Sequence, residues 1–356
     1  MPRLKPLSEQ VIVITGASSG IGLATAKAAA RQGAQVVLAA RTREALALAV
    51  DEINQAGPGR ASFVEADVGE HREHEKIAAH AIDRHGRIDT WINNAGVLVF
   101  GKLEEVGEAD MRQLFETNFW GVVHGSLVAA RHLRAQGGAL INVGSLESDR
   151  GIPLQGIYAA SKQAVKGFTE VLRVELESEG APISVTLVKP GSIGTPMPQH
   201  TKAYSETEPQ FPSPIYAPEE AALSILAAAE RPMREVFVGG SARTLSALSA
   251  IAPRAMDWIS EKFLISGQIS DRPVTPTDNL SEGHGEAKVR GDHGGAMIRP
   301  SLYSMAARNP VATIAVAGGI AAGAFLLTRR RSEPSALVED GVEEEREVAR
   351  PPLEGV

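Results

Sequence analysis

The chain has 356 residues, of which 43% are hydrophobic and 22% are charged, and its formal net charge is −7. This balance is ordinary for a globular protein and excludes a disordered chain, a collagen-like repeat and a membrane protein with many spans. Acidic residues outnumber basic ones, so the basic footprint of a nucleic-acid-binding protein is absent. Because there is no cysteine, disulfides, thiolate metal sites and a cysteine nucleophile are excluded as well.

Short apolar runs alternate with amphipathic stretches from residue 11 to about residue 240. Several of the runs are continuous and β-branched, which is typical of strands buried on both faces. The predicted strands are Val11–Thr15, Ala34–Ala39, Ser62–Glu65, Thr90–Asn93, Ala139–Val143, Ser184–Val188 and Glu235–Val238. The predicted helices are Gly20–Gln32, Arg43–Gln55, His71–His85, Glu108–Arg134, Ile157–Glu179 and Pro218–Glu230. This alternation predicts an α/β fold with a Rossmann-type, doubly wound parallel sheet and helices on both faces.

A glycine-rich turn follows the first predicted strand, with glycines at Gly16, Gly20 and Gly22. Glycine permits a tight turn and a close approach of the backbone to a phosphate, and the helix that begins here points free N–H groups at an anion. A purely structural turn is the alternative, because the spacing differs from the more widespread G-x-G-x-x-G pattern. Its place between a first strand and a first helix favours a dinucleotide site.

Two arginines, Arg41 and Arg43, follow the second predicted strand, and no acid occurs from Val36 to Arg43. A site for NAD(H) usually places an acid here to bind the ribose 2′-hydroxyl, whereas a cation suits the 2′-phosphate of NADP(H). The sequence therefore predicts NADP(H) as the preferred cofactor, with NAD(H) as the alternative. The two arginines also fit a solvated start of the next helix.

Tyr158 and Lys162 lie four residues apart near the start of a long predicted helix, which places the phenol and the ammonium on one face. A nearby cation favours the phenolate and lowers the pKa of a tyrosine, so the pair can act as an acid and base. Ser145 follows the strand Ala139–Val143, at the edge where α/β sheets bind ligands. Asn118 lies inside a predicted helix, where its amide serves either the site or a packing hydrogen bond.

Together these residues resemble a short-chain dehydrogenase/reductase of the main branch, whose signature is Y-x-x-x-K. The resemblance covers about residues 8–240, and the gap of 13 residues between Ser145 and Tyr158 fits the pattern. The matching motifs, in chain order, are T-G-x-x-x-G-x-G at Thr15–Gly22, Asp67 in Ala66–Val68, N-N-A-G at Asn93–Gly96, Asn118, Ser145, Tyr158 with Lys162, and Pro190–Thr195.

The resemblance implies a role for each of these residues. Tyr158 would exchange a proton with the substrate oxygen, Ser145 would polarise the carbonyl, and Asn118 would fix a water that relays the proton. Lys162 would bind the nicotinamide ribose and lower the pKa of Tyr158. The cofactor-binding residues would be Gly16, Ser18, Ser19, Gly20, Ile21, Gly22, Arg41, Asp67, Val68, Asn94, Ala95, Gly96, Tyr158, Lys162, Pro190, Gly191, Ile193 and Thr195.

The substrate loop is expected over residues 195–216, where five prolines oppose a helix and favour an extended lid. Its aromatic residues Tyr204, Phe211 and Tyr216 form either an apolar wall or an exposed set. The stretch Leu146–Arg150 is unusually polar for a pocket rim; a solvent-facing position is one option, and no substrate is inferred from it. The histidines show no metal-site spacing; His74, in the predicted helix His71–His85, is expected to be solvated, and no metal is expected.

The C-terminal part differs in composition from the rest. A helical extension is predicted over residues 241–270, which either packs on the domain, covers the substrate cleft or lies on a membrane surface. A polar, Gly-rich linker is predicted over residues 271–310. Residues 311–328 carry no charge and, at a 1.5 Å rise, span about 27 Å, so a single transmembrane helix is predicted, with a buried core helix as the alternative. Residues 329–356 read as a basic, then acidic, disordered tail.

The membrane orientation follows two opposing signals. Arg329–Arg331 favour the cytosolic side for the end of the span, which places the catalytic domain outside. The absence of an apolar run in Met1–Gln10 and the expected NADP(H) favour a cytosol-facing domain, which is our prediction.

The leading functional hypothesis is an NADP(H)-dependent oxidoreductase that acts on a carbonyl or secondary alcohol. If the chain is anchored in a membrane, lipophilic substrates are one option. The alternatives are a catalytically silent, nucleotide-sensing interaction protein, and an epimerase or dehydratase on the same fold. The expected partners are a small-molecule substrate, a membrane through residues 311–328, and a second copy of the chain, because the helices Glu108–Arg134 and Ile157–Glu179 usually form the dimer seam in similar proteins.

Overall fold

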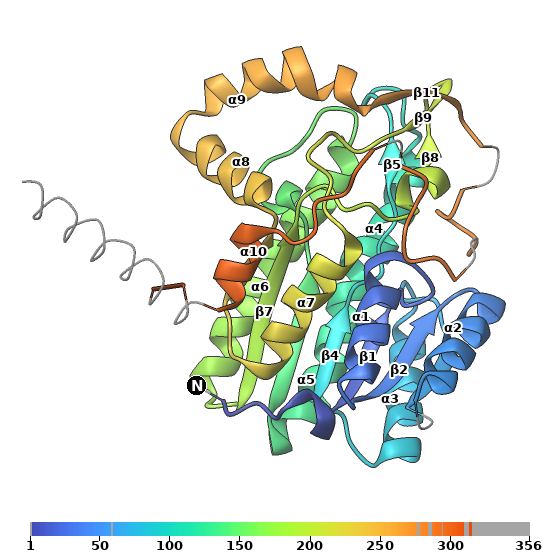
Figure 1. Cartoon of the computed structure of the whole chain (residues 1–356), viewed down its shortest axis with the longest axis vertical. Helices are drawn as coiled ribbons and strands as arrows, with labels where there is room; N and C mark the ends of the chain where they lie inside the picture. The colour runs from blue at the N-terminus through green and yellow to red at the C-terminus, as the bar shows by residue number, and fades with distance from the viewer. Residues whose placement is uncertain are drawn as a thin grey trace, which may run out of the picture. The chain divides into compact units, whose positions relative to one another are not determined.

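Seven parallel strands form the central sheet, in the order β10-β7-β6-β4-β1-β2-β3 (Figure 1). The computed structural model describes residues 2–57, 60–275, 278–283, 287–293, 295–309 and 313–314. The described residues as far as Arg308 belong to one unit, and the chain from Asn309 belongs to a second. The predicted span 311–328, apart from Thr313 and Ile314, and the tail 329–356 lie outside the described residues. Among the residues that are described, no helix is long and apolar enough to cross a membrane.

The predicted strands and helices are present, and the prediction of a Rossmann-like α/β fold with a parallel sheet is confirmed. The strands of the sheet are β1 Val11–Thr15, β2 Gln35–Ala40, β3 Ala61–Glu65, β4 Thr90–Asn93, β6 Gly138–Val143, β7 Ile183–Pro190 and β10 Glu235–Val238. The helices are α1 Gly20–Arg31, α2 Arg43–Gln55, α3 His71–His85, α4 Glu108–Phe115, α5 Gly121–Gln136, α6 Gly156–Ser178 and α7 Pro218–Glu230.

Both faces of the sheet are covered, because alternate side chains of each strand enter different apolar clusters. On β1, Ile12 and Ile14 belong to a cluster shared with α1, α2 and α7, whereas Val13 belongs to one shared with α3, α5 and α6. Each fully buried aliphatic side chain contributes roughly 1.5–3 kcal/mol relative to exposure. Burial of these side chains therefore holds the strands between two layers of helices. Because the strands are parallel, their carboxyl ends meet at one edge of the sheet.

The predicted helix Glu108–Arg134 is interrupted by a π-helical turn at Glu116–Trp120. The residues on either side keep helical dihedrals, so the chain continues from α4 into α5 without a loop. A single wide turn of this kind shifts the side chains that follow it and often occurs at functional sites. It carries Asn118, whose side chain is fully buried.

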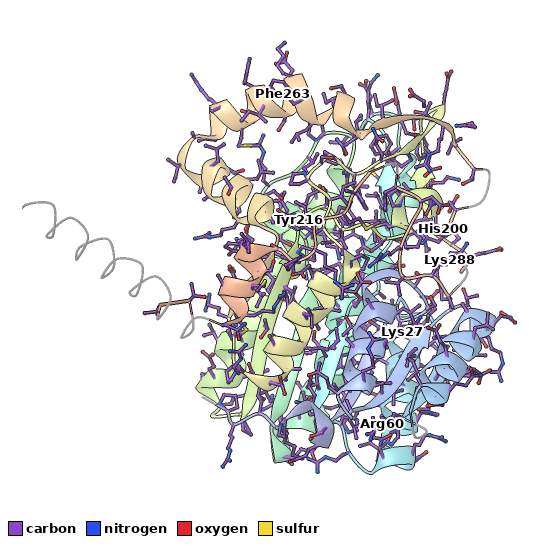
Figure 2. The ribbon with its side chains drawn as sticks, viewed as in Figure 1. Lys27, Arg60, His200, Tyr216, Phe263 and Lys288 are labelled. Atoms are coloured by element: carbon purple, nitrogen blue, oxygen red, sulfur yellow. The ribbon has the colours of Figure 1, made fainter. Side chains whose placement is uncertain are left out.

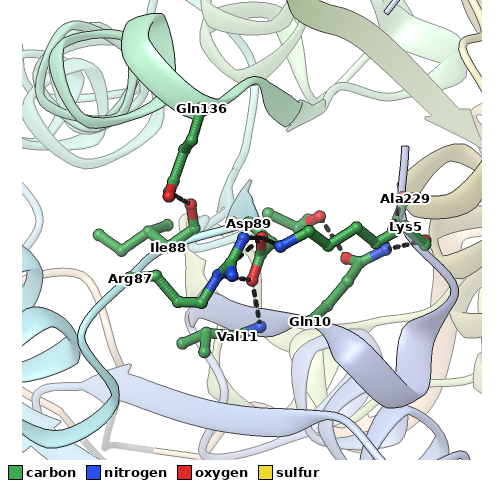
Figure 3. Close-up of polar contacts among 9 residues, drawn as sticks. Lys5, Gln10, Val11, Arg87, Ile88, Asp89, Gln136 and Ala229 are labelled. Carbon is green, nitrogen blue, oxygen red and sulfur yellow. Dashed lines mark hydrogen bonds and ion pairs between the residues drawn. The ribbon is translucent and has the colours of Figure 1, made fainter. Parts of the chain in front are cut away.

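Asp89 connects the strands at the amino-terminal edge of the sheet, opposite the carboxyl ends (Figure 3). Its carboxylate accepts hydrogen bonds from the backbone N–H of Val11 at 2.9 Å and from Lys5 Nζ at 3.0 Å. The guanidinium of Arg87 binds both carboxylate oxygens. Gln10, next to Val11, donates to the carbonyl of Ala229 at 2.9 Å, so this edge also anchors α7.

His74 on α3 is fully buried, and the expectation that it is solvated is wrong. Its Nε2 lies 2.9 Å from the carbonyl oxygen of Val68, and its ring packs 6.1 Å from that of Trp91. The pKa of His74 is lowered to about 4, chiefly by burial and to a smaller extent by the neighbouring His124 and His71.

The extension after residue 240 folds onto the same unit. Helices α8 Gly240–Ile251 and α9 Pro253–Ile259 form an arm that leads to β11 Ile269–Pro273, and α10 Leu302–Arg308 follows later in the chain (Figure 1). Strand β11 pairs antiparallel with β9 Thr207–Pro209. On α10, Arg308 binds Glu220 at 3.1 Å, so much of the stretch predicted as a linker packs on the domain. Phe263 lies beyond α9 with 58% of its surface exposed (Figure 2).

Candidate active site

A cleft lies at the carboxyl ends of β1, β2, β4, β6 and β7 and encloses about 1550 Å³, including space open to solvent. This is the edge at which open α/β sheets bind their ligands. The predicted site residues that line it are Gly16, Ser18, Ser19, Gly20, Ile21, Arg41, Asp67, Val68, Asn94, Ala95, Gly96, Ser145, Tyr158, Lys162, Pro190, Gly191, Ile193 and Thr195. Gly22 and Asn118 lie behind this lining.

The turn between β1 and α1 depends on its glycines. Gly16 has φ +63°, and a Cβ there would lie 2.6 Å from Ala95 Cα; a Cβ on Gly22 would lie 2.3 Å from the carbonyl oxygen of Gly16. The side-chain amide of Asn94 donates to the carbonyls of Thr15 at 2.9 Å and of Gly16 at 3.1 Å, which ties the turn to the end of β4. The backbone is thereby held at a close approach that only glycine allows, as a phosphate-binding turn requires.

The amino terminus of α1 opens into this cleft, and Ser19 at its N-cap makes no capping hydrogen bond with its side chain. Helix termini of this kind attract anions through free N–H groups and the helix dipole. In this structure the N–H of Gly20 donates to the carbonyl oxygen of Lys288 at 2.9 Å. An anion that uses the same N–H would therefore displace that carbonyl.

Arg41 is the charged side chain at the end of β2. Its guanidinium donates to the carbonyl oxygens of Asn279, Leu280 at 3.2 Å and Ser281 at 3.1 Å. These carbonyls belong to a strap, residues 278–283 and 287–293, which contains Lys288 (Figure 2). The N–H of Asn279 in this strap also donates to the carbonyl of His200. No carboxylate lies within ion-pair distance of Arg41 in the described part of the chain, so its charge is oriented but not neutralised.

Arg43 takes a different position from Arg41. Its guanidinium stacks over the ring of Phe63 at 5.4 Å and lies 3.9 Å from a carboxylate oxygen of Glu65. It does not line the cleft. Of the two arginines after the second strand, Arg41 alone is placed to meet a ligand there, and Arg43 has the role of a solvated helix start.

Ser145, Tyr158 and Lys162 meet on the substrate side of the cleft. Ser145 is the N-cap of the short 3-10 turn Leu146–Ser148, and its Oγ accepts a hydrogen bond from the N–H of Glu147 at 3.1 Å. Because that bond uses an oxygen lone pair, the hydroxyl proton remains available for donation, either to Tyr158 or to a ligand. Tyr158 and Lys162 lie in the first two turns of α6 and are 9% and 3% exposed.

The pKa of Tyr158 differs from the expectation that Lys162 lowers it. Burial raises the pKa of the phenol above its ordinary value, the charge of Glu147 raises it further, and a hydrogen bond with Ser145 opposes them. The ammonium of Lys162 lies 5.6 Å from the centre of the phenol ring and donates to the carbonyl of Val143 at 3.1 Å. Burial also lowers the pKa of Lys162 to about 8, so desolvation outweighs the opposing effect of the Glu147 charge.

Asn118 is positioned by the π-helical turn, and its side chain is engaged with the protein. Its Oδ1 accepts from the N–H of Val97 at 2.8 Å, and its Nδ2 donates to the carbonyl of Val97 at 2.9 Å and to Ser161 Oγ at 3.2 Å. A packing role for the amide is therefore satisfied. Gly96 lies between the Asn118 amide and the Lys162 ammonium, since a Cβ on Gly96 would be 3.4 Å from Asn118 Oδ1 and 3.5 Å from Lys162 Nζ.

The polar stretch Leu146–Arg150 is buried for most of its length, so the solvent-facing option does not apply to these buried residues. Leu146, Glu147 and Ser148 are 7%, 3% and 3% exposed. The side chain of Asp149 anchors the turn through Lys166 at 2.6 Å and Lys189 at 2.9 Å, and these contacts help to lower the pKa of Asp149 to about 2. Periodicity does not reveal this, because the partners come from α6 and β7.

The substrate side has an apolar wall that the sequence predicts only in part. Phe211 lines the cleft, whereas the hydroxyl of Tyr204 binds Asp110 at 2.7 Å and Tyr216 is buried beside Gly239. The predicted lid contains the 3-10 turn Met197–His200 and the strands β8 Lys202–Ala203 and β9, where β8 pairs with β5 Val99–Phe100. Other lining residues that the sequence analysis missed are Leu98, Glu147, Ile152, Gln155, Met197, His200, Asn279 and Gly283.

Comparisons with known proteins identify the family of this architecture. A sequence model described as short chain dehydrogenase matches residues 10–206. The uncharacterized oxidoreductase YxnA of Bacillus subtilis is 45% identical over 327 residues, which cover 90% of this chain and 92% of that protein. The 11-beta-hydroxysteroid dehydrogenase A of Sesamum indicum is 35% identical over 261 residues, covering 70% of this chain and 74% of that protein.

Solved structures share the fold. A short chain dehydrogenase/reductase from Burkholderia phymatum in complex with NAD matches with a TM-score of 0.64 and 26% identity, covering 71% of this chain and 96% of that one. An alcohol dehydrogenase from Thermococcus sibiricus complexed with 5-hydroxy-NADP matches with a TM-score of 0.57 and 26% identity, covering 64% and 95%. Nicotinamide dinucleotides of both kinds thus occur among the neighbours.

Proposed function

Since the chain belongs to the short chain dehydrogenase family, we propose that it transfers a hydride between NADP(H) and a carbonyl or secondary alcohol. The observation that carries this proposal is the meeting of Ser145, Tyr158 and Lys162 in the cleft into which the β1–α1 turn opens. A glycine cradle that any Cβ would fill fits a dinucleotide phosphate at one end of the cleft. At the other end of the cleft, the acid Tyr158, the hydrogen-bond donor Ser145 and the cation Lys162 fit a reacting carbonyl group.

The reaction divides between the cofactor and the protein. The bound nicotinamide supplies or takes the hydride, and the protein supplies position and electrostatics. In reduction, the hydroxyl of Ser145 donates to the carbonyl oxygen, and Tyr158 transfers its phenolic proton to the same oxygen. The raised pKa keeps the phenol protonated at neutral pH, and the cation of Lys162 stabilises the phenolate that remains. Asn118 holds the Val97 backbone and, on this proposal, helps to position the water that returns the proton.

Turnover by the purified chain tests this function. We expect oxidation of NADPH with some member of a panel of aldehydes and ketones, followed by the absorbance of the reduced nicotinamide. Tyr158→Phe is expected to lower kcat by roughly 10²- to 10⁴-fold, as the loss of a general acid does. Tyr303→Phe, outside the cleft, is the matched control. Activity that survives in Tyr158→Phe contradicts the mechanism, and cofactor binding without any turnover favours a nucleotide-sensing protein.

We propose NADP(H) as the preferred cofactor because Arg41 is the cation at the ribose end of the cleft and no carboxylate pairs with it among the described residues. The strap carbonyls hold its guanidinium in place, so a 2′-phosphate would find it oriented but would compete with these neutral acceptors. NAD(H) is the alternative.

We propose that residues 311–328 tether the chain to a membrane with the catalytic domain facing the cytosol. The support is the uncharged stretch of sequence, which precedes Arg329–Arg331. Such a tether favours lipophilic substrates. Carbonate extraction of membranes from cells that express the full chain should leave the protein in the pellet, and Ile320→Lys should release it; release of both proteins would contradict the tether.

We also propose that the chain forms a homo-oligomer. Leu127 on α5 and Val171 and Val174 on α6 are 43%, 57% and 57% exposed, and the two helices cover the same face of the sheet. A second copy would cover them. Light scattering should give at least twice the mass of one chain, and Val171→Glu should reduce that mass.

A further inference from the structure

Glu147 is a buried acid at the catalytic end of the cleft. Its side chain is 3% exposed, and it lines the cleft together with Ser145, Tyr158 and Lys162. The backbone of Glu147 donates to Ser145 Oγ, and the turn that holds both residues is capped by Ser148. The backbone of Glu147 is therefore fixed beside the hydroxyl that is proposed to hold the substrate oxygen, and its carboxyl group lies close enough to Tyr158 and Lys162 to affect the pKa of both.

Little within the protein satisfies this carboxyl group. Among the described residues, its one hydrogen bond comes from the N–H of Ile152 at 3.4 Å, and no cation lies within ion-pair distance. Burial raises the pKa of Glu147 well above its ordinary value, and the charge of Lys162 opposes this rise only in part. Asp149, two residues later, differs: it binds Lys166, Lys189 and Ser246 at 2.6, 2.9 and 2.6 Å. Buried acids are normally paired or hydrogen-bonded, because an unsatisfied buried acceptor is costly. Asp149 holds the turn, whereas the acceptors of Glu147 are left for a ligand.

The surroundings of Glu147 divide the substrate end into a polar and an apolar part. Gln155, also in the lining, is 4% exposed and is held by Gln268 at 2.5 Å. Leu98 and Phe211 belong to the apolar lining of the same cleft. A purely apolar ligand that fills the cleft would leave the carboxyl group without a donor, while a ligand with a hydroxyl or amine would supply one.

We propose that Glu147 is a specificity-determining residue that accepts a hydrogen bond from a hydroxyl or amine carried by the substrate next to its reacting carbon. This inference rests on the proposed oxidoreductase function. The preferred substrates are then α-hydroxy ketones or, in the reverse direction, vicinal diols and amino alcohols. Apolar ketones of the same shape are poorer substrates. The proximity to Ser145, which would hold the oxygen on the reacting carbon, places the donor on the neighbouring carbon.

Two pairs of matched substrates test this assignment. One pair is 1-hydroxybutan-2-one and pentan-3-one, in which a methyl group replaces the hydroxyl; the other is 2-hydroxycyclohexanone and 2-methylcyclohexanone. With NADPH and the full chain, we expect kcat/KM to favour the hydroxy ketone by about 10- to 100-fold, the range expected when a buried acceptor is otherwise left without a donor. Glu147→Leu should bring the ratio to within about threefold of one.

Two further variants make the result interpretable. Glu147→Gln keeps the shape and one neutral acceptor, so its ratio should lie between those of the wild type and Glu147→Leu, and it replaces the leucine variant if that one does not fold. Glu175→Gln, on the exposed face of α6, should keep the wild-type ratio. A wild-type ratio near one, or a high ratio that persists without the carboxylate, overturns the role of Glu147 while leaving the oxidoreductase function intact. Absence of turnover on every carbonyl tested contradicts the function itself.

Discussion

The buried imidazole of His74 makes the stability of the protein depend on pH. In the folded chain, Nε2–H donates to the carbonyl of Val68, and Nδ1 has no hydrogen-bond partner among the described residues. A second proton on this ring would be buried without an acceptor. Burial, with the charges of His124 and His71, lowers the pKa of His74 to about 4, although Asp67 and the bond to Val68 oppose the shift.

The size and sign of the effect follow from this shift. Above about pH 6.5 the imidazole is neutral in both the folded and the unfolded chain, and the stability is fully present. As the pH falls toward about 4, the unfolded chain takes up a proton that the folded chain refuses, so stability is lost across this window. The lowering of this pKa from its ordinary value of 6.5 to about 4 corresponds to a loss of about 3 kcal/mol.

Denaturant unfolding of the wild type and His74→Gln at several pH values measures this loss. Glutamine can donate to Val68 and does not titrate, so the free energy of unfolding of the wild type, relative to the variant, should fall by about 2–3 kcal/mol between about pH 7.5 and 4.5. His132→Gln, on α5, controls for removal of a histidine elsewhere. A difference between wild type and His74→Gln that stays constant across this range would refute the argument.

Three other substitutions probe the cofactor site and the sheet. Arg41→Ala should raise KM for NADPH about 10- to 100-fold more than KM for NADH, as loss of a charge-assisted contact predicts, and equal effects would contradict a 2′-phosphate site. Gly22→Ala should weaken NADPH binding, which fluorescence measures, and should lower the free energy of unfolding by about 1–3 kcal/mol in a thermal melt, because the new Cβ would lie 2.3 Å from the Gly16 carbonyl oxygen. Gly167→Ala is the control: the space around Gly167 is open, so this substitution should not lower the free energy of unfolding. Asp89→Ala should lower stability by about 2–3 kcal/mol, measured by denaturant unfolding, since Arg87 and the Val11 N–H lose their acceptor, and a change below about 0.5 kcal/mol would show that water replaces it.

The fold and much of the cleft were predictable from the sequence because both depend on short-range patterns. Continuous apolar runs such as Val11–Thr15 can be buried only inside a covered sheet, and the helices between them force parallel pairing. The glycine turn and the i, i+4 spacing of Tyr158 and Lys162 place their groups at one edge once the sheet exists. These features need no knowledge of what lies across the molecule.

What tertiary structure alone decided are the contacts between segments far apart in the chain. From the sequence, Glu147 belongs to a polar stretch that fits a solvent-facing position; in the structure, Lys166 and Lys189 anchor the turn that carries it, and it is buried. From the sequence, Arg41 is a cation without a known partner; in the structure, its guanidinium donates to carbonyls of residues 279–281. Burial and charge pairing depend on distance in space, and spacing along the chain does not reveal a partner in another element, whether it is 17 residues away, as Lys166 is from Asp149, or 239, as Leu280 is from Arg41. For the same reason the pKa of Tyr158 is set by burial and by Glu147, which the four-residue spacing to Lys162 does not reveal.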